Sequence, residues 1–180
     1  MQKQINGPLV IALVLLTSTS AARAAETAGS AREAIRALKA LHSALSVGLT
    51  NRDYQQRLID TNIIVDQYLE TPRAGERSVQ SIVERAMIID RMALSVWNAR
   101  LMSDDRVPLA TIDALHEFPS CPNVRPITTR IRDNYPNSTD RANLGVDSSF
   151  TENMLPLLWA CAADQIRSAE REMAKQGAKR

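Results

Sequence analysis

The sequence is poor in the residues that build most catalytic and metal sites. Its 180 residues include only two histidines, two cysteines and six glycines. Neither His42 nor His116 belongs to an H-E-x-x-H or E-x-x-H pattern, so the signatures of zinc proteases and di-iron bundles are missing. The glycines are too far apart for a phosphate-binding loop, a dinucleotide fingerprint or a G-x-S-x-G elbow. The sequence therefore predicts no catalytic residue, metal or cofactor, and an enzyme is the least favoured class.

The chain also lacks an excess of charge of either sign. It has 22 basic and 20 acidic residues, and Lys3 and Arg23, which account for the difference, both lie close to the N-terminus. The rest of the chain is balanced and gives no general electrostatic attraction toward nucleic acid or anionic lipid. We therefore expect no nucleic-acid partner.

Long hydrophobic runs are missing as well, apart from a short one near the N-terminus. Lys3 precedes the apolar run Leu9–Leu16, and Ala22-Arg23-Ala24 places small residues where a signal peptidase cuts. The run is shorter than the ~20 residues needed to span a bilayer. Residues 1–24 are therefore predicted to be a signal peptide that is cut after Ala24, which makes the mature chain periplasmic or secreted and leaves it no membrane span. Retention of this segment as an anchor is the alternative.

The two cysteines, Cys121 and Cys161, both lie in the predicted mature chain. An even number of cysteines in an exported protein favours a disulfide. By closing the loop between the two cysteines, such a bond would stabilise the folded state by about 4 kcal/mol in the chain-entropy description. The alternative is a pair of buried free thiols that never meet.

Apolar residues recur at intervals of three and four over most of the chain, and no alternating run is long enough to predict a strand. Ser30 with Glu33, and Thr50 with Asp53, are typical of helix N-caps. Helices are expected at about 30–49, 50–71, 78–103 and 108–117, and from 149 onward. The stripe expected to face the core on the second of these helices is Tyr54, Leu58, Ile59, Ile63, Val65 and Leu69.

Four prolines interrupt the helical pattern between residues 119 and 148. This segment is predicted to be a long loop, with one short helix or turn around Ile127 and Ile131. A further proline, Pro156, predicts either a kink in the last helix or a start near Leu155. Together these patterns predict a single all-α, four-helix-bundle-like domain over residues 25–180.

A few polar residues fall on or beside the predicted apolar faces, namely Asn62, Asp66 and Asp90, with Trp97 two turns beyond Asp90. Polar groups on a buried stripe need partners. We favour the interpretation that these residues fix the helix register, with Asp66 or Asp90 bonded to an arginine or to Trp97. The alternative is a ligand pocket between the second, third and fourth helices around Asn62, Asp90 and Trp97. His42 is expected to lie in or beside the core and to make one hydrogen bond.

The long loop carries four arginines, which form either a solvated mixed-charge segment or a contact surface for an acidic partner. They are Arg125, Arg130, Arg132 and Arg141.

The sequence as a whole favours an exported helical module that binds an unidentified protein or envelope partner through this loop and one helix face. A small-ligand-binding bundle is the alternative. The partner and the oligomeric state are left open.

Overall fold

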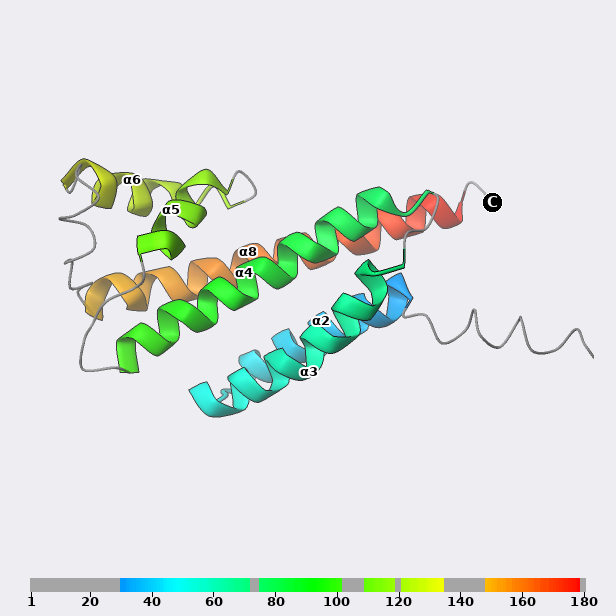
Figure 1. Cartoon of the computed structure of the whole chain (residues 1–180), viewed down its shortest axis with the longest axis horizontal. Helices are drawn as coiled ribbons and strands as arrows, with labels where there is room; N and C mark the ends of the chain where they lie inside the picture. The colour runs from blue at the N-terminus through cyan, green and yellow to red at the C-terminus, as the bar shows by residue number, and fades with distance from the viewer. Residues whose placement is uncertain (1–29, 72–74, 102–108, 119–120, 135–147, 179–180) are drawn as a thin grey trace, which may run out of the picture.

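The computed structural model describes residues 30–71, 75–101, 109–118, 121–134 and 148–178, and all its regular elements over these ranges are helical (Figure 1). The predicted signal peptide and Arg141 lie outside the described residues. The described helices are α2 (Ala31–Ser46), α3 (Asn51–Leu69), α4 (Arg77–Leu101), α5 (Leu109–Glu117), α6 (Arg125–Asn134) and α8 (Ser148–Gly177).

The two longest helices, α4 and α8, run antiparallel beside each other and form the central pair of the fold (Figure 1). Helices α2 and α3 form an antiparallel hairpin that packs against one end of this pair, with α3 on α4 and α2 on α8. Helices α5 and α6 pack together at the other end, where α5 contacts α4. No helix among the described residues is both long and apolar enough to cross a membrane.

The predicted helix starts at Ser30 and Thr50 are confirmed. The Ser30 hydroxyl accepts the Glu33 backbone N–H at 3.2 Å, and the Thr50 hydroxyl accepts that of Asp53 at the same distance. These bonds satisfy backbone donors that the first helical turn leaves without a partner. Gly48 adopts a φ of 89°, which suits glycine, and lets the chain leave α2 and turn toward α3.

The core consists of two clusters of buried side chains, one at each end of the α4–α8 pair. The first lies under the α2–α3 hairpin, and its largest members are Tyr54, Tyr68, Leu38, Leu41 and Met87. The second lies under α5 and α6, and includes Ile112, Leu115, Val124, Met154 and Leu158 together with both cysteines. Trp97 and Trp159 pack against both clusters and therefore mark the boundary between them.

The register of α3 differs from the prediction. Ile59 and Ile63 are 49% and 53% exposed, so their assignment to the buried stripe was wrong. The buried positions alternate in steps of four and three, as in a coiled-coil seam, because α3 contacts its neighbours along one narrow line. They are Tyr54, Leu58, Thr61, Val65 and Tyr68.

Part of the segment that was predicted to be a long loop is helical in the described residues. Helix α6 occupies residues 125–134, where the sequence allowed one short helix around Ile127 and Ile131. Helix α8 begins at Ser148, which confirms the helix expected from 149 onward, and it continues through Pro156, so the alternative of a start near Leu155 was wrong. Pro156 is exposed, whereas Met154 and Leu158 on either side are buried. This burial offsets the hydrogen bond that proline cannot donate.

Candidate functional site

A buried carboxylate lies where α2, α3 and α4 meet. Asp90 is 0% exposed and accepts a hydrogen bond from His42 Nε2, which lies 3.0 and 3.2 Å from its two oxygens. The Tyr54 hydroxyl lies 3.2 Å from Asp90 Oδ1 and 3.1 Å from the Asp90 backbone oxygen. Since a carboxylate only accepts, His42 carries its hydrogen on Nε2. The partners of Asp90 are therefore a histidine and a tyrosine. Of the two aspartates for which an arginine or Trp97 was the expected partner, Asp66 is the one that lies beside an arginine, Arg91.

The Tyr54 ring of this cluster packs against two tryptophans. The Tyr54 ring centre lies 5.6 Å from that of Trp97 and 6.1 Å from that of Trp159, and the two tryptophans are 5.4 Å apart. Burial, and then the Asp90 carboxylate, raise the pKa of the Tyr54 hydroxyl far above its ordinary value. The arrangement joins three helices, with Tyr54 and Asp90 both 0% exposed and the His42 side chain 15% exposed.

Asn62 and Asp66 lie in different surroundings, in a polar cluster on the surface of α3. Asn62 donates to Asp66, and Arg91 on α4 donates to Asn62 and lies 3.5 Å from Asp66. The side chains of Arg91 and Asp66 are about half exposed, at 51% and 46%. The structure therefore separates Asn62, which is bonded at the surface, from the buried Asp90.

The disulfide between Cys121 and Cys161 is present, with a Cα–Cα distance of 5.5 Å. It ties the segment that leads into α6 to the middle of α8, inside the second core cluster. His116 Nδ1 lies 3.2 Å from Thr128 Oγ1, which joins α5 to α6. Among the predicted loop arginines, Arg125 and Arg130 are exposed on α6 and Arg132 is partly buried there.

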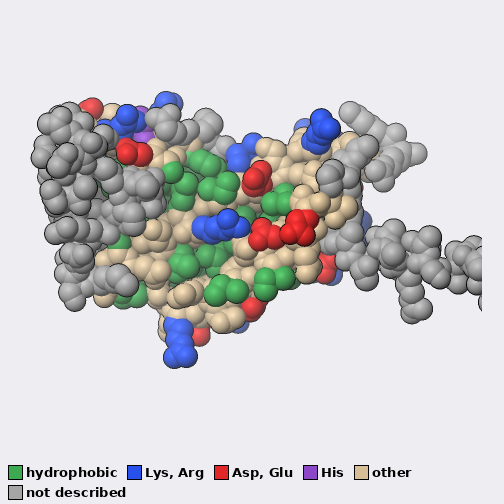
Figure 2. All heavy atoms as spheres, viewed as in Figure 1, with side chains coloured by type: hydrophobic (Ala, Val, Ile, Leu, Met, Phe, Trp, Pro, Cys, Tyr) green, Lys and Arg blue, Asp and Glu red, His purple; other side chains and the backbone are tan. Residues whose placement is uncertain are grey.

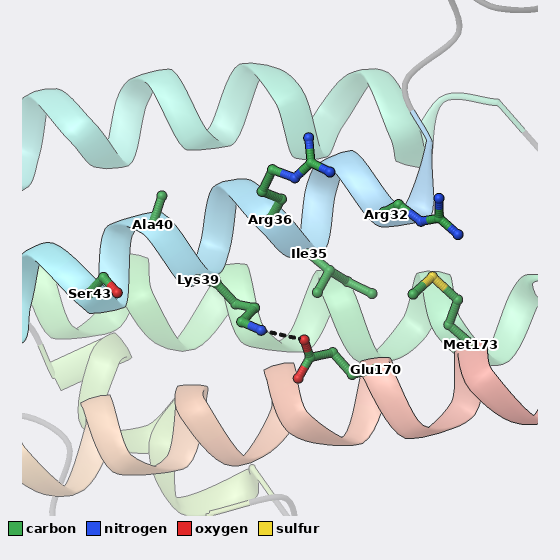
Figure 3. Close-up of a pocket in the computed structure, with 8 residues that line it drawn as sticks. All are labelled: Arg32, Ile35, Arg36, Lys39, Ala40, Ser43, Glu170 and Met173. Atoms are coloured by element: carbon green, nitrogen blue, oxygen red, sulfur yellow. Dashed lines mark hydrogen bonds and ion pairs between the residues drawn. The ribbon is translucent and has the colours of Figure 1, made fainter.

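Sequence reasoning missed a groove between α2 and α8 (Figure 3). Its volume is about 370 Å³, and the Lys39 ammonium bonds the Glu170 carboxylate across it at 2.6 Å. Figure 3 shows the side chains of Arg32 and Arg36 extending from α2, with Met173 projecting from α8. The groove is lined by Arg32, Ile35, Arg36, Lys39, Ala40 and Ser43 from α2 and by Glu170 and Met173 from α8.

The charges of this groove are segregated. Its α2 side carries three cations, Arg32, Arg36 and Lys39, against the single carboxylate of Glu170. Neither arginine has an ion-pair partner among the described residues. The cations repeat at intervals of four and three residues, which places them along one helix face. That spacing is visible in the sequence, but the opposite wall is not, because it comes from the other end of the chain.

The opposite face of the molecule has no such segregation. Figure 2 shows α3 and α4 toward the viewer, and there the hydrophobic side chains are scattered between single basic and acidic groups. Among the described residues, no group of three or more histidine, cysteine, aspartate or glutamate side chains is placed to hold a metal ion. The α2–α8 groove is therefore the candidate site.

Comparison with protein-family models, with curated proteins and with solved structures finds no match. The site is accordingly interpreted from its own geometry.

Proposed function

We propose that this protein is an exported, four-helix-bundle-like interaction module that binds a segment of another protein in the α2–α8 groove. One observation carries the proposal: the groove combines apolar side chains with two guanidinium groups that have no ion-pair partner among the described residues. Interfaces are commonly built in this way, with apolar anchors inside a charged or polar rim. Arginine in particular is enriched among the residues that contribute most to binding.

The anchoring of α2 supports this assignment. Ile35, Leu38 and Leu41 are buried in the first core cluster, and His42 is bonded to Asp90 on α4. The inward face of α2 is thus held in place, so its outward cations need little reorganisation on binding. A small-ligand site around Asp90 receives no comparable support, since His42 and Tyr54 already occupy its carboxylate.

The export part of the proposal rests on residues 1–24, and the disulfide is compatible with an oxidising compartment. It is tested by the intact mass of the chain recovered from the periplasm of cells that express residues 1–180. A chain that begins at Ala25 and is two hydrogens lighter than the reduced form is expected. A chain that retains residues 1–24 would contradict a cleaved signal.

The binding part is tested by site-specific photo-cross-linking in the protein's own cells. A benzophenone side chain at Ala40, which is exposed in the groove, should give discrete adducts. The same side chain at Gln55, which is exposed on α3, is the matched control. Excess unlabelled mature chain should suppress the Ala40 adducts, whereas an Ala40→Trp chain with a filled groove should not. Equal adducts from both positions, or equal suppression by both competitors, would refute groove binding.

A further inference from the structure

We infer that the occupant of the α2–α8 groove is an acidic amphipathic helix of the partner, whose carboxylates lie along Arg32, Arg36 and Lys39. This inference rests on the proposed function and specifies the chemistry of the partner. It follows from three properties of the groove, which are the spacing of its cations, the kind of backbone that can dock there, and its unbalanced charge.

The spacing of the cations matches that of a helix. Arg32, Arg36 and Lys39 are separated by steps of four and three residues, so at 1.5 Å per residue they rise by about 6 Å and then about 4.5 Å along α2. Carboxylates at the same intervals on a second helix have the same rises and share one face. Side chains on one face of an extended strand recur every ~6.6 Å, which fits the first step but not the second.

The secondary structure around the groove also favours a helical partner over an extended one. A strand that binds by sheet extension needs a free sheet edge, and the regular elements of the described residues are all helices. The space beside two packed helices instead accepts the apolar ridge of a third. Ala40 is exposed and small enough to leave room for a larger apolar side chain, and Ile35 and Met173 add apolar surface farther along the groove. Methionine adapts its shape readily to such a partner.

The charge of the groove selects an acidic occupant. The lining residues carry three cations and one carboxylate, although the acidic and basic residues of the predicted mature chain balance. Arg32 and Arg36 can each bind a carboxylate through two parallel N–H groups. The Lys39–Glu170 pair is solvated, with 56% and 38% of its side chains exposed, so Lys39 can exchange partners at little cost. A basic or neutral helix would leave both guanidinium groups without a counter-charge.

The inference is tested by selection from a phage library of random 16-residue peptides on the folded, disulfide-bonded mature chain. The recovered peptides should be rich in Asp and Glu at helical intervals of three and four, with interspersed apolar residues. Circular dichroism should show that they gain helix on binding. Recovery of neutral or basic peptides, or of none, would overturn the inference.

Charge variants then test whether the selected peptides bind at the arginines of α2. Arg32→Glu with Arg36→Glu should weaken peptide affinity at least tenfold, and Arg32→Gln with Arg36→Gln should weaken it by a smaller factor. The matched control is Arg52→Glu with Arg57→Glu on α3, where both arginines are exposed and the net charge changes equally. That control should bind within about twofold of the native chain. Equal affinity for all four proteins would overturn the inference, and melting curves verify that each variant is folded.

Two further measurements distinguish a failure of this inference from a failure of the proposed function. Peptides whose binding is lost in Ala40→Trp but unaffected by charge reversal would refute an acidic partner while leaving groove binding intact. Peptides that bind Ala40→Trp as well as the native chain would remove the groove from the proposed function itself. Co-sedimentation with phosphatidylglycerol vesicles that requires Arg32 and Arg36 would assign the site to a lipid surface and overturn the inference.

Discussion

Replacing Asp90 with alanine should lower the free energy of unfolding by about 3 kcal/mol, because it removes the carboxylate to which His42 Nε2 is hydrogen-bonded. A hydrogen bond to a charged group contributes about 1.5–3 kcal/mol, and a neutral donor left without its partner in a buried site costs about 1–3 kcal/mol. His42 Nε2 loses both carboxylate oxygens, at 3.0 and 3.2 Å. Tyr54 keeps the Asp90 backbone oxygen at 3.1 Å, so its share of the loss is smaller. We assign about 2 kcal/mol to His42 and about 1 kcal/mol to Tyr54.

Urea denaturation measures this loss, with tryptophan fluorescence as one signal and far-ultraviolet circular dichroism as the other. Trp97 and Trp159 pack on Tyr54, so their emission reports on the cluster directly. For a domain of this size a loss of 3 kcal/mol lowers the melting temperature by roughly 6–12 °C. Asp60→Ala, at an exposed position on α3, is the control and should change stability by less than about 0.5 kcal/mol.

A double-mutant cycle with His42→Ala isolates the pair. If the hydrogen bonds carry the effect, His42→Ala should cost about 2 kcal/mol in the native background and close to nothing when Asp90 is already alanine. Equal costs in the two backgrounds would refute the reasoning, as would an Asp90→Ala protein within about 1 kcal/mol of the native chain. Either result would mean that apolar packing alone fixes how α2 and α4 meet.

Three other perturbations follow from the same structure. Cys121→Ala with Cys161→Ala should lower the free energy of unfolding by about 4 kcal/mol in urea denaturation, and stability equal to that of the oxidised chain would contradict this. The raised pKa of Tyr54 keeps its hydroxyl protonated in the folded protein, whereas the unfolded chain ionises near pH 10; its contribution to stability is therefore complete below about pH 10 and falls above it. A near-ultraviolet absorbance titration of the folded protein should accordingly be the same for Tyr54→Phe as for the native chain. Arg91→Ala should change stability by less than about 1 kcal/mol in the same urea assay, because Arg91 and Asp66 are half exposed, and a larger loss would show that the surface cluster supports the fold.

Features that depend on a few neighbouring residues could be predicted from the sequence. The caps at Ser30 and Thr50 are contacts between residues three positions apart in the sequence. The positive φ of Gly48 follows from its place at the end of a helical stripe. The disulfide was predictable for a different reason, because two cysteines in a chain that is predicted to be exported leave few alternatives.

Features that depend on tertiary packing could not be predicted in the same way. Ile59 and Ile63 are more apolar than Thr61, yet Thr61 is buried, because the line along which α3 meets its neighbours decides which positions turn inward. The sequence predicted a helix from 149 onward but left open whether Pro156 would kink it or delay its start. That α8 continues through Pro156 reflects its burial against α4, which outweighs the local cost of proline.

The partners of Asp90 and the α2–α8 groove were missed because in each case the residues that meet are far apart in the sequence. Asp90 lies 48 residues from His42 and 36 from Tyr54, and no spacing rule connects them. Lys39 and Glu170 are 131 residues apart, so only the cationic side of the groove could be read from the sequence, and even that resembled an ordinary solvated helix face.

The two faces of α2 explain why its cations can serve recognition without being needed for the fold. Its inward face carries Leu38 and Leu41 in the core, and His42 on Asp90, so α2 is fixed by burial and by one polar anchor. Its outward cations, Arg32 and Arg36, contribute no ion pair to that arrangement among the described residues. Charge reversal there should therefore change binding while leaving stability nearly unchanged, whereas loss of the Asp90 anchor should change stability first. The proposed binding and the stability of the fold therefore rest on different residues of one helix, which makes the two roles separable by experiment.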